Sequence, residues 1–349
     1  MARMQDLRPS ECGSKPPLFV LWTGDSGAKR GNKFSRDVIT WELNNITVQL
    51  LALRERLGGV PVYPVLGNHD SYPQHQFEPT DNWVYGVAAD LWAPLVPASA
   101  LPTLRKGGYY VVPDVAPKLR LLVINTALYY RQNNKTDLKD KDPGGQIAWM
   151  RQQLAAAKAA GDAVYIASHV PPGMTADPMH REHVKPFLDG MKGYHSIIRG
   201  SFWGHVHIDS FQLLGNTSTG DYHVAHLAST MGTKTGKNPA FRRYLYDTSN
   251  YTIRDWTTFY MDLPAVNKAG KITWKELYSA RKEYGVADAQ PKSMLALVGS
   301  MKKNNKLFLK AWKHLKADAP TGSCSAACKK EYFCRILYSY PSDFDKCMK

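Results

Sequence analysis

Five side chains of types that commonly bind metal ions lie at the ends of four apolar segments of this chain. The segments are FVLWTGD, VYPVLGNHD, AVYIASH and SFWGHVH, and the side chains are those of Asp25, Asn68, His169, His205 and His207. Aspartate, asparagine and histidine form a mixed nitrogen and oxygen ligand set, which suits Zn, Mn or Fe better than Ca or Mg. Taken singly, such a residue is more often a cap or turn residue than a ligand. The four segments together, in this order, predict one metal centre.

The segments that precede these residues have the composition of buried strands. Runs rich in Val, Ile, Leu, Tyr and Phe span residues 18–23, 60–66, 121–125, 163–168 and 197–203. Helical apolar patterns separate several of them, at 38–57 and 145–160. Strands that alternate with helices predict a layered α/β domain. Such folds place their sites at the carboxyl ends of the strands, where these ligands lie.

The second half of the chain has a different pattern. Segments between residues 224 and 263 alternate in polarity and are rich in aromatic residues, which predicts hairpin strands. From about residue 272 the pattern is helical, and four of the five cysteines crowd into the C-terminal end. We therefore expect a main domain over residues 17–265 and a helical, cysteine-bearing subdomain over residues 266–349.

The charge balance favours anionic partners. Lys and Arg outnumber Asp and Glu by 45 to 30, which gives a formal net charge of +15. Phosphate esters, polyphosphate, nucleic acid or an acidic membrane surface would suit this excess, and a solvated basic surface explains it about as well. The densest basic stretch, 302–316, has the spacing of the solvent-facing side of a helix. We therefore predict no specific nucleic-acid site, and peripheral contact with an anionic membrane stays open.

The cysteine cluster indicates an oxidising compartment. Its spacing, C-x3-C-x5-C-x12-C, contains no C-x2-C pair, so disulfides are favoured over a zinc site. Sequons provide glycosylation candidates at Asn45, Asn134, Asn216 and Asn250, a number only slightly above chance. Residues 1–16 lack the apolar core of a signal peptide. We expect a full-length form to be secreted or directed to a lysosome- or vacuole-like compartment, and this chain to be shortened at its N-terminus.

Longer motifs resemble a known family. GD, GNHD, SH and GHVH in this order are similar to the calcineurin-like metallophosphoesterases, and WTGD, YPVLGNHD, SHVPPG, GHVHID and NPAFRRYLYD narrow the resemblance to the acid sphingomyelinase-like phosphodiesterases. The resemblance runs from about Leu18 to Cys347 and implies two mixed sheets packed as a sandwich with helices outside. It also implies disulfides Cys324–Cys328 and Cys334–Cys347. Parts of the first third (WTGD, NKFSRD, ELNNI) also resemble the vacuolar endopolyphosphatases.

The resemblance implies two divalent metal ions, with Zn expected first and Mn or Fe as alternatives. Asp25 would bridge the ions, and Asn68, His169 and His205 would complete one site, with His207 in the other. Two ions about 3.5–4 Å apart can clamp the phosphoryl oxygens of an ester.

Proton transfer is implied for the residues that follow Asn68. His69 would assist the leaving group, because an imidazole can protonate a departing alkoxide near neutral pH. Asp70 would orient the His69 ring.

The chain departs from the family pattern at two points. The family begins with a D-x-H strand that supplies two ligands, whereas all eleven histidines here lie at or after His69. The family's GDxxxH histidine is replaced by Lys29, a candidate phosphate-binding cation that cannot act as a neutral imidazole. One ion site is therefore expected to be whole, and the other to retain only Asp25 and His207.

We expect this chain to hydrolyse a phosphodiester bond of a small-molecule or polymeric substrate. An endopolyphosphatase that cleaves phosphoanhydride bonds is one alternative. An alternative of another class is a single-metal binding protein without catalytic activity, either truncated or a true variant.

Overall fold

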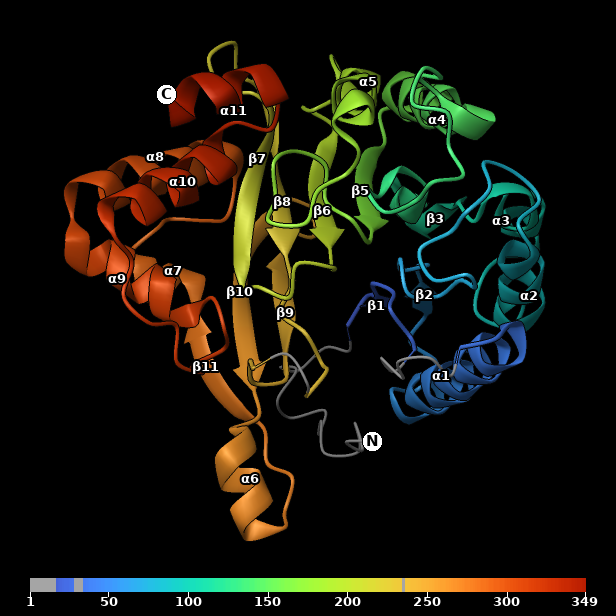
Figure 1. Cartoon of the computed structure of the whole chain (residues 1–349), viewed down its shortest axis with the longest axis horizontal. Helices are drawn as coiled ribbons and strands as arrows, with labels where there is room; N and C mark the ends of the chain where they lie inside the picture. Colours follow the sequence, from blue (N-terminus) through green and yellow to red (C-terminus); the bar gives the residue numbers. More distant parts are fainter. Residues whose placement is uncertain (1–16, 28–33, 234–235) are drawn as a thin grey trace.

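A mixed six-stranded sheet forms the centre of the computed structural model, which describes residues 17–27, 34–233 and 236–349 (Figure 1). Its strand order is β3-β4-β5-β6-β8-β7, with β4, β5, β6 and β8 parallel and the edge strands β3 and β7 antiparallel to their neighbours. The bounds are β3 (Tyr110–Ala116), β4 (Leu119–Val123), β5 (Ala163–Ser168), β6 (Ile198–Trp203), β7 (Ser210–Asn216) and β8 (Asp221–Leu227).

The second layer consists of two smaller sheets. β1 (Val20–Trp22) pairs with β2 (Val62–Pro64) in parallel, and an antiparallel sheet contains β9 (Ala240–Tyr246), β10 (Ile253–Tyr260) and β11 (Lys275–Ser279). The rings of Tyr165 and Phe202 touch on one face of the central sheet, with centroids 5.5 Å apart. Phe19, beside β1, contacts Tyr165, and Tyr244 of β9 contacts Phe202. Both small sheets therefore cover the same face, which confirms the predicted sandwich, although its second layer is divided rather than one mixed sheet.

Helices cover the remaining surfaces. α1 begins after Ser35, whose hydroxyl accepts the Val38 N–H at 3.2 Å, and α4 begins where the Asp142 carboxylate accepts the N–H groups of Ile147 and Ala148. In the described residues no helix is long and apolar enough to cross a membrane. The α-helices are α1 (Arg36–Arg56), α2 (Trp83–Trp92), α3 (Leu101–Gly107), α4 (Gln146–Ala160), α5 (Arg181–Met191), α6 (Leu263–Ala269), α7 (Ala280–Tyr284), α8 (Pro291–Lys303), α9 (Asn305–His314), α10 (Ala326–Leu337) and α11 (Pro341–Met348); short 3-10 turns are η3 (Ala98–Ala100), η4 (Thr126–Tyr129) and η5 (Pro143–Gly145).

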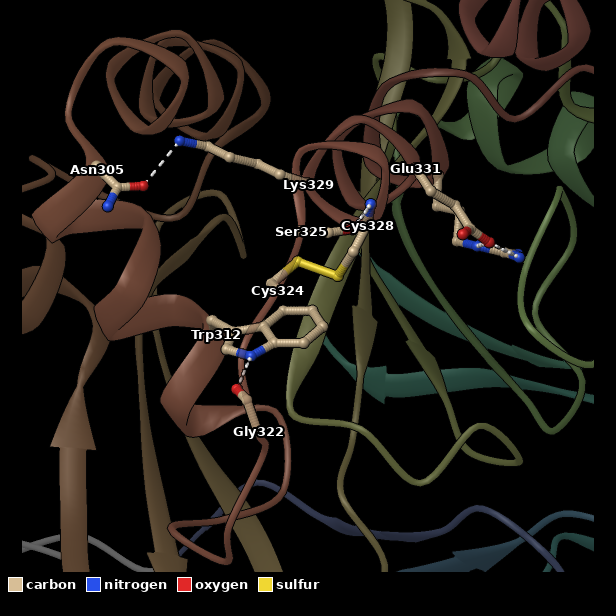
Figure 2. Close-up of a disulfide and its surroundings, with 9 residues drawn as sticks. Asn305, Trp312, Gly322, Cys324, Ser325, Cys328, Lys329 and Glu331 are labelled. Carbon is tan, nitrogen blue, oxygen red and sulfur yellow. Dashed lines mark hydrogen bonds and ion pairs between the residues drawn. A yellow bond between two sulfur atoms is a disulfide. The ribbon is translucent and has the colours of Figure 1, made fainter.

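The C-terminal helices gather beside β7, opposite α1–α3 (Figure 1). The expected disulfides Cys324–Cys328 and Cys334–Cys347 are both formed. Figure 2 shows the Trp312 indole beside the first of them, with its N–H donating to the Gly322 carbonyl at 2.9 Å.

The helical prediction from about residue 272 is wrong for β11. Lys275–Ser279 pairs with β10, and Tyr278 is buried against the sheet. Tertiary pairing therefore outweighed the local helical pattern of this segment. The domain boundary expected between residues 265 and 266 stays a prediction, although β11 joins a sheet that begins before it.

Candidate metal centre

The predicted ligands follow strands whose ends meet at one edge. Asp25 follows β1, Asn68 follows β2, His169 follows β5 and His205 follows β6. The loops after β1 and β2 touch so closely that a Cβ on Gly67 would lie 2.1 Å from the main-chain nitrogen of Asp25. Only glycine fits there, because no other residue lacks that atom.

Three of the predicted ligands have a strained backbone. Asp25, His205 and His207 have φ angles of 58°, 65° and 54°, in the left-handed region that side-chain-bearing residues seldom occupy. Such strain persists only where the surrounding structure enforces it, and it is concentrated at functional sites.

Four ligand atoms converge on one point. The Asn68 Oδ1 lies 2.9 Å from the His169 Nε2 and 2.8 Å from the His205 Nδ1. The His169 Nε2 in turn lies 3.2 Å from the Asp25 Oδ1. Ligand atoms around an ion held at about 2.1 Å are separated by roughly 3–3.5 Å, so a shift of a few tenths of an ångström would admit one. The donor set and its geometry therefore fit a single divalent transition metal ion.

A second set of contacts orients the two histidines. The His169 Nδ1 faces the Thr23 carbonyl oxygen, and the His205 Nε2 faces the Asp177 carbonyl oxygen at 3.0 Å. Asp177 also accepts hydrogen bonds from the Tyr130 hydroxyl at 2.7 Å and the Arg131 Nε at 2.6 Å. Metal-binding histidines usually have such a partner on their other nitrogen, which fixes the ring and the tautomer.

The Asp70 side chain connects the loop after β1 to the loop after β2 by hydrogen bonds. Its carboxylate accepts the main-chain N–H groups of Asp25 (3.1 Å), Ser26 (2.7 Å) and Gly67 (2.7 Å). The His69 Nδ1 meets the side-chain amide of Gln74, and the expectation that Asp70 orients His69 stays a prediction.

Neighbouring charges shift the pKa values of both carboxyl groups in the centre. Burial by itself would raise the pKa of Asp25, but the neighbouring His169 and His69 together hold that pKa well below its usual range. Burial and the nearby Asp25 carboxylate raise the pKa of Asp70 to about 7. A cation at this point would therefore compensate two closely spaced carboxylates.

The remaining predicted residues are distributed as follows. Among the described residues, the group of possible metal ligands contains Asp25, His169 and His205 but not His207, whose assignment to a second ion stays a prediction. Lys29 lies outside the described residues. The sequon residues Asn134, Asn216 and Asn250 are exposed and Asn45 is half-buried, and their glycosylation stays a prediction.

Sequence reasoning missed three residues around the centre, namely His75, Tyr130 and Asp177. The His75 Nδ1 lies 2.9 Å from the Asn68 Nδ2, and the Tyr130 ring packs edge-on against both His75 and His205. The one available signal was the position of His75 seven residues after Asn68, inside the same loop.

Comparisons with known proteins agree with this geometry. The calcineurin-like phosphoesterase model matches residues 2–209, and the model of the acid sphingomyelin phosphodiesterase C-terminal region matches residues 222–349. The cyclic GMP-AMP phosphodiesterase of Mus musculus is 33% identical over 95% of this chain and 77% of its own length. The acid sphingomyelinase-like phosphodiesterase 3b of Homo sapiens is 30% identical over 95% of this chain and 75% of its own. The sphingomyelin phosphodiesterase of Bos taurus is 33% identical over 91% of this chain, which spans about half (52%) of that relative.

Proposed function

The chain belongs to the calcineurin-like phosphoesterases, in their acid sphingomyelinase-like branch, and on that basis we propose that it hydrolyses phosphodiester bonds with a divalent metal ion. The observation that carries the proposal is the convergence of four ligand atoms at strand ends. They belong to Asp25, Asn68, His169 and His205. When bound, the ion supplies Lewis-acid stabilisation of the phosphoryl oxygens and activation of the attacking water.

His69 supplies the proton for the leaving oxygen. The side chain of Gln74 contacts the His69 Nδ1, so Nε2 is the nitrogen that can carry the transferred proton. The His69 main-chain N–H donates to the Asp25 Oδ1 at 2.9 Å, which keeps the ring beside the metal centre. General acid catalysis requires this combination of a protonated nitrogen and a fixed position.

We propose a single tightly held ion, with Zn as the metal. The two histidine nitrogens and two side-chain oxygens form a four-ligand set of the kind that Zn accepts. His207 adds one further candidate ligand for a second, weaker ion.

A soluble anionic diester is the substrate class we propose. The net charge of +15 would raise its concentration near the surface, and the similarity to a cyclic GMP-AMP phosphodiesterase extends over 95% of the chain. The two disulfides favour an oxidising compartment, either extracellular or lysosomal.

Turnover of bis-p-nitrophenyl phosphate by the chain tests the activity. We expect turnover that is lost after treatment with a chelator, is restored by Zn, and is absent in His169→Ala. Chelator-resistant turnover would refute the metal-dependent mechanism. Parallel assays with a cyclic dinucleotide and with sphingomyelin vesicles separate the substrate classes, and hydrolysis of the lipid alone would contradict the proposed class.

A further inference from the structure

The Asn68 side chain must present its oxygen, and not its nitrogen, to the metal centre. A carboxamide has an oxygen and an NH2 group of nearly the same size, and only the oxygen can coordinate a cation. In this structure Oδ1 faces His169 and His205 at 2.9 and 2.8 Å. Asn68 is buried, with 1% of its surface exposed, so its NH2 group requires a partner on the opposite side.

His75 provides that partner. Its Nδ1 lies 2.9 Å from the Asn68 Nδ2. The His75 ring is held edge-on between the rings of His69 and Tyr130, with centroid distances of 4.7 and 5.2 Å. Tyr130 is fixed in turn by its hydroxyl, which donates to the Asp177 carboxylate at 2.7 Å. The position of the His75 ring is therefore determined by its neighbours.

The buried Asn68 NH2 group is satisfied when the His75 Nδ1 acts as its acceptor. That nitrogen also lies 3.0 Å from the Asn68 main-chain oxygen, to which it could donate only if it carried a proton. A proton there would face the Asn68 Nδ2–H across 2.9 Å, with two donors directed at each other. Because Oδ1 faces His169 and His205, the tautomer that also satisfies the Asn68 NH2 group carries its proton on Nε2.

We propose that His75 is a positioning residue of the metal centre, whose Nδ1 lone pair holds the Asn68 carboxamide with its oxygen toward the ion. This inference rests on the proposed function, since it concerns the same ion. The backbone φ angle of His75 is 68°, in the left-handed region, which asparagine tolerates better than most residues. Asparagine also offers an acceptor oxygen, so it is the natural conservative replacement.

The test compares His75→Ala with His75→Asn by Zn affinity, measured through competition with a chromophoric chelator. Loss of a residue that orients a ligand typically weakens metal binding by about 10–100-fold, and we expect this for His75→Ala. His75→Asn is expected to recover most of the affinity. Excess Zn should restore the turnover of His75→Ala, because the reacting groups remain in place.

The melting temperature of each ion-free variant serves as the folding control. Equal Zn affinity in wild type and His75→Ala would overturn the positioning role, as would His75→Asn binding as weakly as His75→Ala. Absence of Zn binding by the wild-type chain would instead overturn the proposed function and this inference with it.

Discussion

Asp209, two residues after the GHVH motif, forms a buried ion pair with Arg242 of β9. The Arg242 Nη2 lies 2.5 Å from the Asp209 Oδ1, and the two side chains are only 1% and 0% exposed. Asp209 also accepts a hydrogen bond from the Thr258 hydroxyl at 2.7 Å. Because Asp209 follows His207 by two residues, this pair fixes one end of the metal-bearing loop to β9 and β10.

Replacing Arg242 with methionine keeps most of the side-chain volume and removes the charge. The Asp209 carboxylate would then be buried without its cation, and breaking a buried pair in this way costs about 3–5 kcal/mol of unfolding free energy. For a chain of 349 residues that corresponds to a fall in melting temperature of roughly 4–7 °C.

A matched control lies in the same sheet. Arg254 lies 2.5 Å from Asp247, but these side chains are 43% and 20% exposed. Water replaces the interaction when such a pair is broken, so Arg254→Met should leave the melting temperature unchanged within error. Thermal unfolding followed by circular dichroism measures both variants. Equal shifts for the two arginines would refute the argument that burial decides the energetic weight of the pair.

Three further changes have defined outcomes. Asp70→Ala removes the carboxylate that accepts three main-chain N–H groups from both metal-bearing loops. Zn affinity in the chelator assay should therefore fall by roughly 10-fold or more. Unchanged affinity would contradict the view that Asp70 holds the two loops together. Burial lowers the pKa of His226 well below its ordinary range, and no ring nitrogen of His226 has a hydrogen-bond partner among the described residues. The contribution of His226 to stability should therefore be complete above about pH 6.5 and should decrease below it, because the unfolded chain takes up a proton that the folded chain resists. Between about pH 7.5 and 5, the melting temperature of His226→Phe should fall less than that of the wild type. An equal fall in both proteins would exclude His226 as the cause. A disulfide that closes a longer loop restricts the unfolded chain more and stabilises the fold more. Removing Cys334–Cys347, with a sequence separation of 13, should lower the free energy of unfolding by about 3 kcal/mol in denaturant, against about 2 kcal/mol for Cys324–Cys328, with a separation of 4. The reverse order would contradict this argument.

The sequence was sufficient to predict which polar residues follow strands and gather at one edge. Asp25, Asn68, His169 and His205 each follow an apolar run, and parallel strands bring such positions to one edge whatever the details of packing. The disulfide pairing could also be expected, from the resemblance to a family whose cysteine spacings match.

Contacts between distant loops could not be predicted in this way. The packing of Tyr130 against His75 and His205 depends on how the loops after β2, β4 and β6 fold over one another. The strand β11 was missed because its pairing with β10, and the burial of Tyr278, are tertiary interactions that a local pattern does not contain.

A titration of the ion-free chain with Zn, with bound metal and turnover of bis-p-nitrophenyl phosphate measured on the same samples, tests the central claim most directly. We predict that turnover rises with the first tightly bound equivalent and that His169→Ala shows neither tight binding nor turnover. Tight binding of Zn without any turnover would contradict the account, as would turnover that is independent of bound metal.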